Sequence, residues 1–240
     1  MATFTLKDAK LYVAQYDMSA HHNRITLTHD AATLDDTAFG DTFRSRISGL
    51  MNVRLDASGH FDAGAGAPDT VYSAVFAASD TVFSVFSEGG DAGEAGYTGK
   101  LLHSEFERGG SVEDLAGFTM RGDGNILVPG WSLYKGTRTS TATSTALNLG
   151  QVAAGKYLYG AIHVTAVSGT DPTLDVIIQS DDAEGFASAT NRITFTQATA
   201  ATSEWGTPVA GALTDSWWRI SATVGGTDPS FTFIVVMGIR

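Results

Sequence analysis

The C-terminal segment constrains the fold most strongly, because its apolar residues recur at every second position. One face of the segment carries Phe231, Phe233, Val235, Met237 and Ile239. The other face is also largely apolar, with Ile234 and Val236. Side chains of a β-strand alternate between two faces, whereas a helix needs a period near 3.6 residues. The segment is therefore predicted to be a strand that is buried, or nearly buried, on both faces.

Shorter stretches with the same alternation predict an all-β fold class. They are rich in β-branched and aromatic residues and cover 9–16, 23–28, 50–61, 80–87 and 97–107. The 27 glycines suit many strands joined by tight turns. One helix is predicted after Pro68, where Asp69 can cap it. Its buried face would then consist of Val71, Tyr72, Val75 and Phe76.

A polar segment of low complexity, GTRTSTATS at 136–144, divides the chain. Such a composition predicts a linker between two domains or a long arm that joins two sheets. We therefore expect one domain over 1–135 and a small β-sandwich domain, immunoglobulin-like or jelly-roll-like, over 145–240. Within the second domain, VSGTDPTLDV at 167–176 and VGGTDPSFTF at 224–233 are similar. Each predicts a Gly and Asp-Pro turn between two apolar strands, as in two similar hairpins.

The charge and composition exclude several classes of protein. The formal net charge is −11 and both parts of the chain are acidic, so the surface does not attract phosphate backbones. An acidic surface serves solubility, and it also suits a channel through which DNA passes without binding. Cysteine is absent, which excludes disulfides, thiolate metal sites and cysteine nucleophiles. We find neither a secretory signal nor an apolar run of about 18 residues, so no membrane span is predicted.

No group of residues predicts catalysis, a cofactor or a metal site. Ser132 and Lys135 have the S-x-x-K spacing, but in a strand they point to opposite faces. His21, His22 and His29 lack a consistent ligand geometry and are predicted to lie on the surface of a hairpin. The chain is therefore predicted not to be an enzyme.

Other polar patterns have structural explanations. The acidic stretch at 180–184 is too short for a calcium loop and predicts a solvated hairpin tip. Arg121-Gly-Asp123 spells an adhesion tripeptide, although a turn between strands accounts for it. His60, His103 and His163 stand alone among strand residues, where partly buried, hydrogen-bonded histidines are expected.

Tryptophans raise a sugar-binding protein as an alternative function. Trp217 and Trp218 are adjacent, so on a strand only one of them can join an exposed platform. Trp131 and Trp205 are the remaining members of the set. We expect these rings to lie mainly in the core or at a subunit interface.

Residues 34–50, LDDTAFGDTFRSRISGL, resemble the segment that follows the first hairpin in tail-tube (major tail) proteins of long-tailed, non-contractile phages. The shared features are an acidic-Thr-Phe-Gly-Asp run, a basic residue, and Gly-Leu at the start of the next strand. The resemblance covers about the first 135 residues: the short helix near 69–78, the long strand at 97–107, and final strands at 112–122 and 125–135. Minimal members of the family lack residues 145–240, which either decorate a tube or complete the subunit's own sandwich.

This resemblance implies a tail-tube-like β-sandwich or barrel in the N-terminal domain and a structural role in the virion. The subunit would form homohexameric or pseudo-sixfold rings, and stacked rings would form a channel for DNA passage. Terminator and tape-measure proteins would be its partners. The protein would assemble in the host cytoplasm and remain in the virion tail. A head-decoration protein built from the same kind of sandwich is a further alternative.

The resemblance also places a subunit interface in the 34–50 segment, at Phe39, Asp41, Arg44 and Arg46. The two arginines would meet acidic groups of a neighbouring subunit, such as Asp35, Asp36 or Asp41. A surface loop with ion pairs inside one subunit is the alternative, and such pairs contribute little individually.

Overall fold

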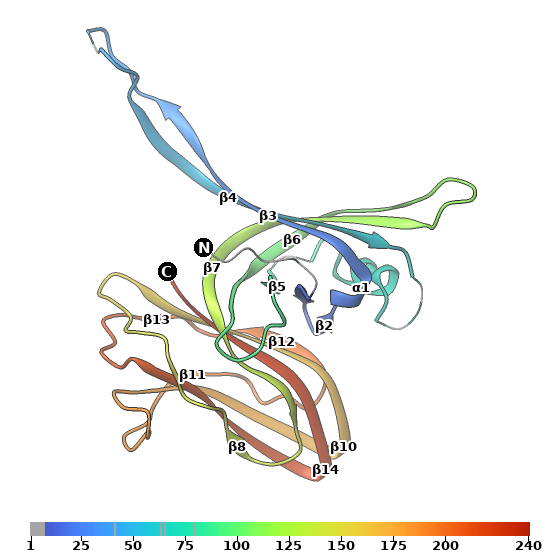
Figure 1. Ribbon diagram of the computed structural model, residues 1–240, viewed down its shortest axis with the longest axis vertical. Helices are drawn as coiled ribbons and strands as arrows, with labels where there is room; N and C mark the ends of the chain where they lie inside the picture. Colours follow the sequence, from blue (N-terminus) through green and yellow to red (C-terminus); the bar gives the residue numbers. More distant parts are fainter. Residues whose placement is uncertain (1–7, 41, 63, 65, 79) are drawn as a thin grey trace. The chain divides into compact units, whose positions relative to one another are not determined.

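The computed structural model describes residues 8–40, 42–62, 64, 66–78 and 80–240 (Figure 1). It confirms the all-β fold class, with one short α-helix and one 3-10 turn among the described residues. The elements, in chain order, are β1 Lys10–Val13, β2 Tyr16–Asp17, η1 Ser19–His21, β3 His22–Asp35, β4 Arg46–His60, α1 Pro68–Val75, β5 Thr81–Phe86, β6 Ala95–Gly109, β7 Gly117–Arg138, β8 Ala142–Thr143, β9 Leu147–Asn148, β10 Tyr157–Asp181, β11 Thr190–Thr194, β12 Thr202–Trp205, β13 Val209–Ala210 and β14 Trp217–Ile239.

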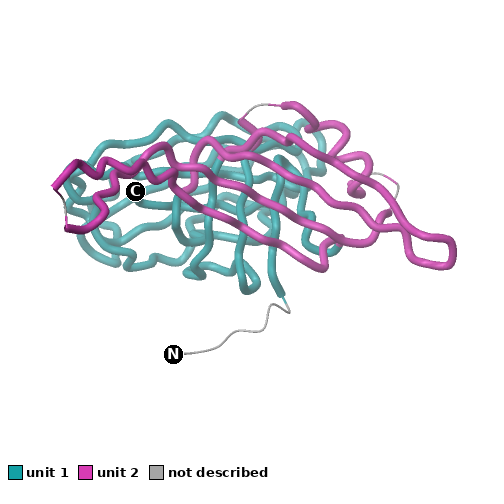
Figure 2. Tube along the Cα trace, turned by 90° about the horizontal axis from the view of Figure 1, so that it is seen from above, with its two compact units in different colours: residues 1–20, 82–99, 128–240 teal, residues 21–81, 100–127 magenta. Residues whose placement is uncertain are grey.

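The chain forms two compact units that interleave along the sequence (Figure 2). Unit 1 comprises residues 1–20, 82–99 and 128–240, and unit 2 comprises 21–81 and 100–127. Strands β6 and β7 each contribute residues to both units. The strands expected at 112–122 and 125–135 are in fact one continuous strand, β7, because no turn interrupts its pairing.

The core of unit 2 lies between its sheet and helix α1. Strand β4 pairs with β3 along its whole length and with β7 only from Val53 to His60. Helix α1 packs on one face of this sheet, where the ring of Tyr72 lies 5.4 Å from that of Phe106 and 5.8 Å from that of Phe118. Alternation along the strands directs apolar residues to this face and polar residues to the other.

Helix α1 is present where the sequence predicts it, but its cap differs. The helix begins at Pro68, and the residue before it, Ala67, makes no side-chain cap, so the predicted cap by Asp69 is wrong. Asp69 lies inside the first turn, where its carboxylate is 2.5 Å from Arg108 Nη1. The helix ends before Phe76, which is therefore 51% exposed rather than packed on the helical face. No helix among the described residues is long and apolar enough to cross a membrane.

Strands β10 and β14 of unit 1 form one long antiparallel pair, from Leu158 opposite Ile239 to Asp181 opposite Trp217. This pair folds back on itself. A Cβ placed on Gly160 would lie 2.8 Å from Ile178 Cδ1, although both residues belong to β10. A straight strand rises about 3.3 Å per residue and would separate them by roughly 60 Å. The two halves of the pair therefore form the two layers of a sandwich.

The two GTDP motifs form the corner of this folded pair. They lie opposite each other, where the β10–β14 register shifts between Ser168 and Thr173. Gly226 has φ +107°, and a Cβ there would lie 2.6 Å from the carbonyl oxygen of Asp171. Gly169 approaches Asp228 in the same way, at 2.7 Å. The expected hairpin turns are thus wrong, because each motif is a bulge within a continuous strand and is stabilised by the other motif.

The C-terminal strand is buried on both faces, as predicted. Phe231, Phe233, Val235 and Met237 belong to the sandwich core, where each is at most 1% exposed. On the other face, Ile234 and Val236 pack with Tyr12 and Phe86. Residues 136–144 are not a free linker, since β7 extends to Arg138 and β8 covers 142–143, and both strands pair with β14.

A buried histidine of unit 1 connects strands β10 and β5 with the turn between β1 and β2. His163 of β10 is fully buried, and its Nδ1 lies 2.6 Å from the carbonyl oxygen of Ala14, which can only accept a hydrogen bond. Nδ1 therefore carries the proton, and Nε2 lies 2.8 Å from the hydroxyl oxygen of Ser84. Burial lowers the pKa of His163 to about 4, so this neutral form persists at ordinary pH.

Candidate functional site

A two-stranded ribbon, the hairpin arm (residues 28–52), extends from unit 2 (Figure 1). It consists of the outer parts of β3 and β4 and of the loop that joins them. Among the described residues, no strand other than β3 pairs with β4 on the N-terminal side of Val53. Every described residue of the arm is exposed except Gly49, which is half-buried. An isolated two-stranded hairpin is only marginally stable in water.

The arm carries large apolar side chains in open solvent. Phe39 at its tip is fully exposed, and Phe43 and Leu50 are 85% and 88% exposed. Leu34 and Ile47 face each other across the two strands and are each about half exposed. Apolar side chains that cluster on a surface in this way mark an interaction site more often than a chance exposure.

Hydrogen bonds fix the base of the loop at the tip. Thr37 donates its backbone N–H to Asp35 Oδ1 at 3.0 Å and also donates its hydroxyl to the same oxygen. These two bonds, the hydroxyl first, lower the pKa of Asp35. Ser45 closes the loop from the other strand, since its N–H donates to Thr37 Oγ1 at 3.0 Å. The two ends of the loop are therefore connected by hydrogen bonds although they are exposed.

The predicted interface residues are placed together at this tip, with one left undescribed. Phe39, Arg44 and Arg46 are all exposed, whereas Asp41 lies outside the described residues. Within the described part of the chain, neither arginine forms an ion pair, although Arg46 lies opposite Asp35. The segment 34–50 is a loop only over 36–45, because strand pairing continues on either side of it.

A second exposed apolar tip lies at the opposite end of unit 2, in the β6–β7 loop at 110–116 (Figures 1 and 2). Val112 is 95% exposed and Leu115 is 75% exposed. The sequence places these residues in or beside a strand, so the tip was missed. The signal in the sequence is the turn composition before them, Gly109-Gly110-Ser111. In the structure Glu113 has a left-handed conformation at φ +81°.

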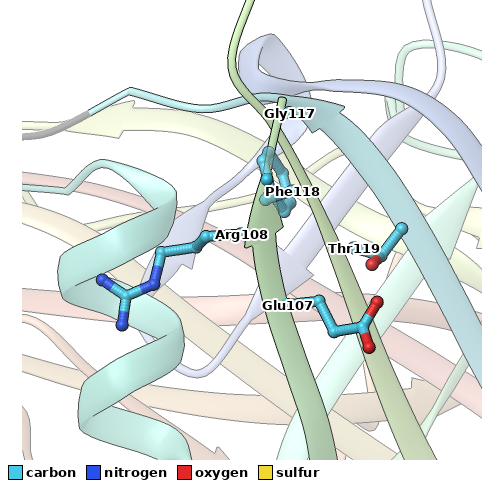
Figure 3. Close-up of a pocket in the computed structure, with 6 residues that line it drawn as sticks. Glu107, Arg108, Gly117, Phe118 and Thr119 are labelled. Carbon is cyan, nitrogen blue, oxygen red and sulfur yellow. The ribbon is translucent and has the colours of Figure 1, made fainter. Parts of the chain in front are cut away.

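A hollow of about 570 Å³ lies at the root of this second hairpin (Figure 3). Its lining residues are Glu107, Arg108, Gly109, Gly117, Phe118 and Thr119. Arg108 is held by Asp69, and Glu107 is the one acid of the lining. The remaining polar side chain of the lining is Thr119, which Figure 3 shows together with Glu107.

The polar face of the unit 2 sheet carries a ladder of ion pairs. Arg121 contacts Asp56 through Nε at 2.8 Å and Glu105 through Nη1 at 2.6 Å. The hydrogen bond to Asp56, followed by the charge of Glu105, raises the pKa of Arg121. Arg54 pairs with Asp123 at 3.4 Å. Arg121 and Asp123 lie within β7, so the expected turn at this tripeptide is wrong.

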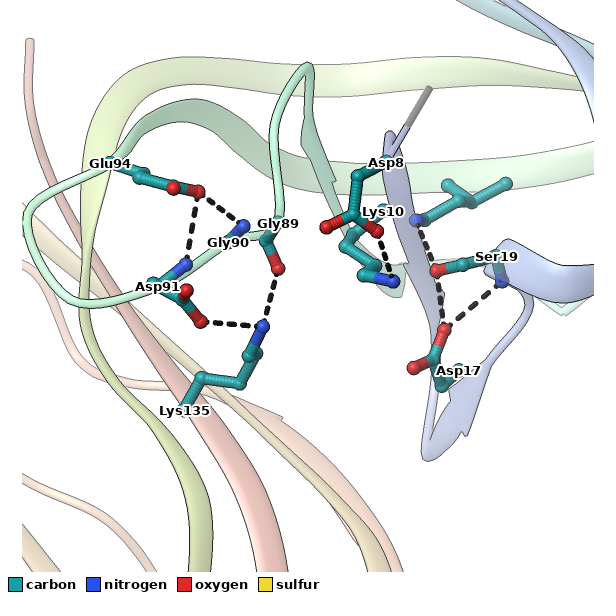
Figure 4. Close-up of polar contacts among 10 residues, drawn as sticks. Asp8, Lys10, Asp17, Ser19, Gly89, Gly90, Asp91, Glu94 and Lys135 are labelled. Carbon is teal, nitrogen blue, oxygen red and sulfur yellow. Dashed lines mark hydrogen bonds and ion pairs between the residues drawn. The ribbon is translucent and has the colours of Figure 1, made fainter. Parts of the chain in front are cut away.

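The structure separates the two residues of the S-x-x-K spacing. Ser132 is fully buried and its hydroxyl has no hydrogen-bond partner among the described residues. Lys135 Nζ donates to the carbonyl oxygen of Gly89 at 2.7 Å and pairs with Asp91 at 2.6 Å (Figure 4). The carboxylate of Asp181 accepts the N–H groups of Ala183 and Ser188, which stabilises the acidic turn at 180–184.

Histidines form no metal cluster among the described residues. His22 Nε2 lies 2.8 Å from the hydroxyl of Tyr72, so His22 belongs to the aromatic core of unit 2 rather than to an exposed hairpin surface. His103 is 2% exposed, and its ring nitrogens have no hydrogen-bond partner among the described residues, contrary to expectation. Burial lowers its pKa to about 4.

Neither a family model nor a curated protein matches the chain. Among solved structures, a chain from the virion of a native gene transfer agent particle is similar, with 15% identity, a TM-score of 0.44, and coverage of 52% of this chain and 97% of that chain. An anti-feeding prophage baseplate chain has 12% identity and a TM-score of 0.39, covering 54% and 97%. The Dit protein of phage SPP1, described as a hub of the adsorption apparatus, has 8% identity and a TM-score of 0.36, covering 98% and 100%. With TM-scores below 0.5, these similarities do not define a function for this chain.

Proposed function

We propose that this protein is a non-enzymatic structural subunit of a phage tail tube, which polymerises through its hairpin arm into stacked rings around a channel for DNA. The observation that carries the proposal is the arm itself. It exposes Phe39, Phe43 and Leu50 on a ribbon that no other described element covers. The proposal also rests on the resemblance of residues 34–50 to the tail-tube family.

The geometry of unit 2 supports polymerisation rather than a closed dimer. The arm and the 110–116 tip are at opposite ends of the unit, and both expose apolar residues. Contacts between different surfaces of identical subunits are heterologous, and they generate rings or open filaments. A subunit whose unit 2 exposes apolar residues at both ends is suited to such an arrangement.

The polar face of unit 2 supports passage of DNA without binding. The guanidinium groups of Arg54 and Arg121 are already paired with carboxylates of the same face. A phosphate backbone gains affinity from arginines and lysines that are available to neutralise it. With paired arginines and a net charge of −11, the protein should bind DNA weakly at physiological salt.

Negative-stain electron microscopy of the purified protein at rising concentration, with light scattering for mass, tests the proposal. We expect rings or hollow tubes from the wild type and a monodisperse monomer from the double variant Phe39→Ser/Phe43→Ser. Phe76→Ser is the matched control, because Phe76 is an exposed phenylalanine of unit 2 outside the arm. Discrete trimers without tubes would instead identify a head-decoration protein and overturn the proposal.

A charge-reversal experiment tests the arginines of the tip. Arg44→Glu/Arg46→Glu should prevent assembly, because both guanidiniums would meet carboxylates of the next subunit. Asp36→Arg should also prevent it if Asp36 is one of those carboxylates. A mixture of the two variants should then regain ring formation, whereas ring formation by the arginine variant alone would exclude this role.

A further inference from the structure

An aromatic row in unit 1 joins Trp205, one of the four tryptophans of the sequence, to two tyrosines of β10. Tyr157 and Tyr159 of β10 point to the same face because they are two residues apart. Trp205 of β12 lies opposite Ala161 and so extends this face onto the neighbouring strand. Ring centroids are 6.4 Å apart between Tyr157 and Tyr159, and 5.8 Å apart between Tyr159 and Trp205.

The row lies at the surface, unlike most large rings of unit 1. Tyr157 is 46% exposed, and Tyr159 and Trp205 are half-buried. Trp218, by contrast, is fully buried and donates its Nε1–H to the carbonyl oxygen of Gly150 at 2.8 Å. The sandwich core therefore contains the ring of Trp218, whereas the three rings of the row lie outside this core.

The polar groups of the row are available to a ligand. In the part of the chain that the structure describes, neither phenol hydroxyl of Tyr157 and Tyr159 nor the indole N–H of Trp205 has a hydrogen-bond partner. Tyrosine and tryptophan that are partly buried usually pair these groups. The row thus combines partly exposed aromatic surface with three polar groups that lack a partner among the described residues, and it contains no side chain that is charged at neutral pH.

The geometry points to a binding site for a neutral polysaccharide on Tyr157, Tyr159 and Trp205. Sugar rings have C–H faces that stack on aromatic rings and hydroxyls at their edges that pair with phenol and indole groups. Successive rings are tilted by 46° and 48°, so the platform twists. Rings at these separations and tilts contact one another, so a glycan chain would meet their outward edges and faces rather than one flat platform.

Affinity electrophoresis in native gels that contain laminarin, dextran, galactomannan or xylan tests this site. We expect at least one of these polysaccharides to retard the wild type. Tyr157→Ala and Trp205→Ala should each weaken the retardation by about tenfold, because a buried aromatic contact contributes strongly to binding. Tyr159→Phe should retain most of it, since stacking survives the loss of the hydroxyl. Tyr97→Ala is the matched control, because Tyr97 is a tyrosine of unit 1 with 45% exposure outside the row.

The outcome is independent of the proposed assembly, because the row belongs to unit 1 and the arm to unit 2. Thermal unfolding should confirm that the variants fold, and they should form the same oligomers as the wild type by light scattering. Normal migration of the wild type in all four gels would overturn the site. Loss of self-association in the row variants would also overturn it, by identifying a protein interface instead.

Discussion

The pairs β3–β4 and β10–β14 are both long antiparallel ribbons, but they bury very different amounts of apolar surface. In the hairpin arm formed by the outer half of β3–β4 and its loop, Phe39, Phe43 and Leu50 remain in solvent. In β10–β14, Trp218 and Phe231 are fully buried. The difference arises from the bend, since β10–β14 folds at its paired GTDP motifs and covers itself. The arm has no such second layer among the described residues, and the proposed interface rests on this difference.

The strongest test of this comparison is to truncate one large ring in each ribbon. Trp218→Ala should lower the free energy of unfolding by about 3–5 kcal/mol, because it leaves a cavity in the sandwich core. Phe39→Ala should leave the free energy of unfolding of the monomer almost unchanged and reduce assembly. Chemical denaturation with light scattering measures both. A large loss of monomer stability in Phe39→Ala would show that the arm is not an open ribbon.

Acid should weaken the folded ribbon through His163. Its folded pKa of about 4 lies below the ordinary value of 6.5, so the unfolded chain binds more protons between these values. The contribution of His163 to the free energy of unfolding is therefore constant above pH 6.5. It falls as the pH decreases toward 4, by about 3 kcal/mol in total. Denaturation at pH 7 and pH 4.5 measures this loss, which should be smaller in His163→Gln. An equal loss in the variant would assign the acid sensitivity to other groups, of which buried His103 is the first candidate.

Gly226 at the β10–β14 corner and Gly40 at the tip of the arm have similar φ angles but different surroundings. Comparing them separates the effect of the corner contact from the effect of backbone strain. Gly226 and Gly40 have φ +107° and +104°. A Cβ on Gly226 would clash with the carbonyl oxygen of Asp171, whereas nothing lies within 4 Å of one on Gly40. Gly226→Ala should therefore cost about 1–3 kcal/mol more than Gly40→Ala. Equal costs in thermal unfolding would mean that backbone strain alone, and not the pairing of the two motifs, accounts for the glycine.

The smallest effect is expected on the polar face of unit 2. Arg54→Ala removes an ion pair with Asp123 whose side chains are 45% and 43% exposed. Water and salt screen such pairs, so the change in the free energy of unfolding should be below about 1 kcal/mol. A larger loss, measured by urea denaturation, would show that this ladder contributes to stability as the core of β10–β14 does.

Local patterns predict the strands well, but long-range pairing decides their length and partners. The alternation at 231–239 correctly predicts a strand buried on both faces. The GTDP motifs read as turns, because Asp-Pro and glycine have the same local signature in a turn and in a bulge. Only the pairing of Gly226 with Asp171 distinguishes the two, and these residues are far apart in sequence.

The candidate site was predicted in part. Phe39, Arg44 and Arg46 lie together on an exposed tip, and their role in an interface remains a prediction. The aromatic row escaped sequence reasoning, because attention to tryptophan does not reveal which tyrosines share a sheet face with Trp205. That information depends on the pairing of β10 with β12, which no local pattern contains.

The reciprocal corner also has a consequence for the alignment of the two strands during folding. Each glycine of the pair accommodates the Asp-Pro of the other strand, so only one alignment of β10 against β14 satisfies both contacts. A slip by one residue would turn every side chain of a strand to the opposite face. The repeated motif therefore fixes the register of β10 against β14. A single inserted residue on one side of it should leave the strands able to pair, yet expose the residues that now form the core.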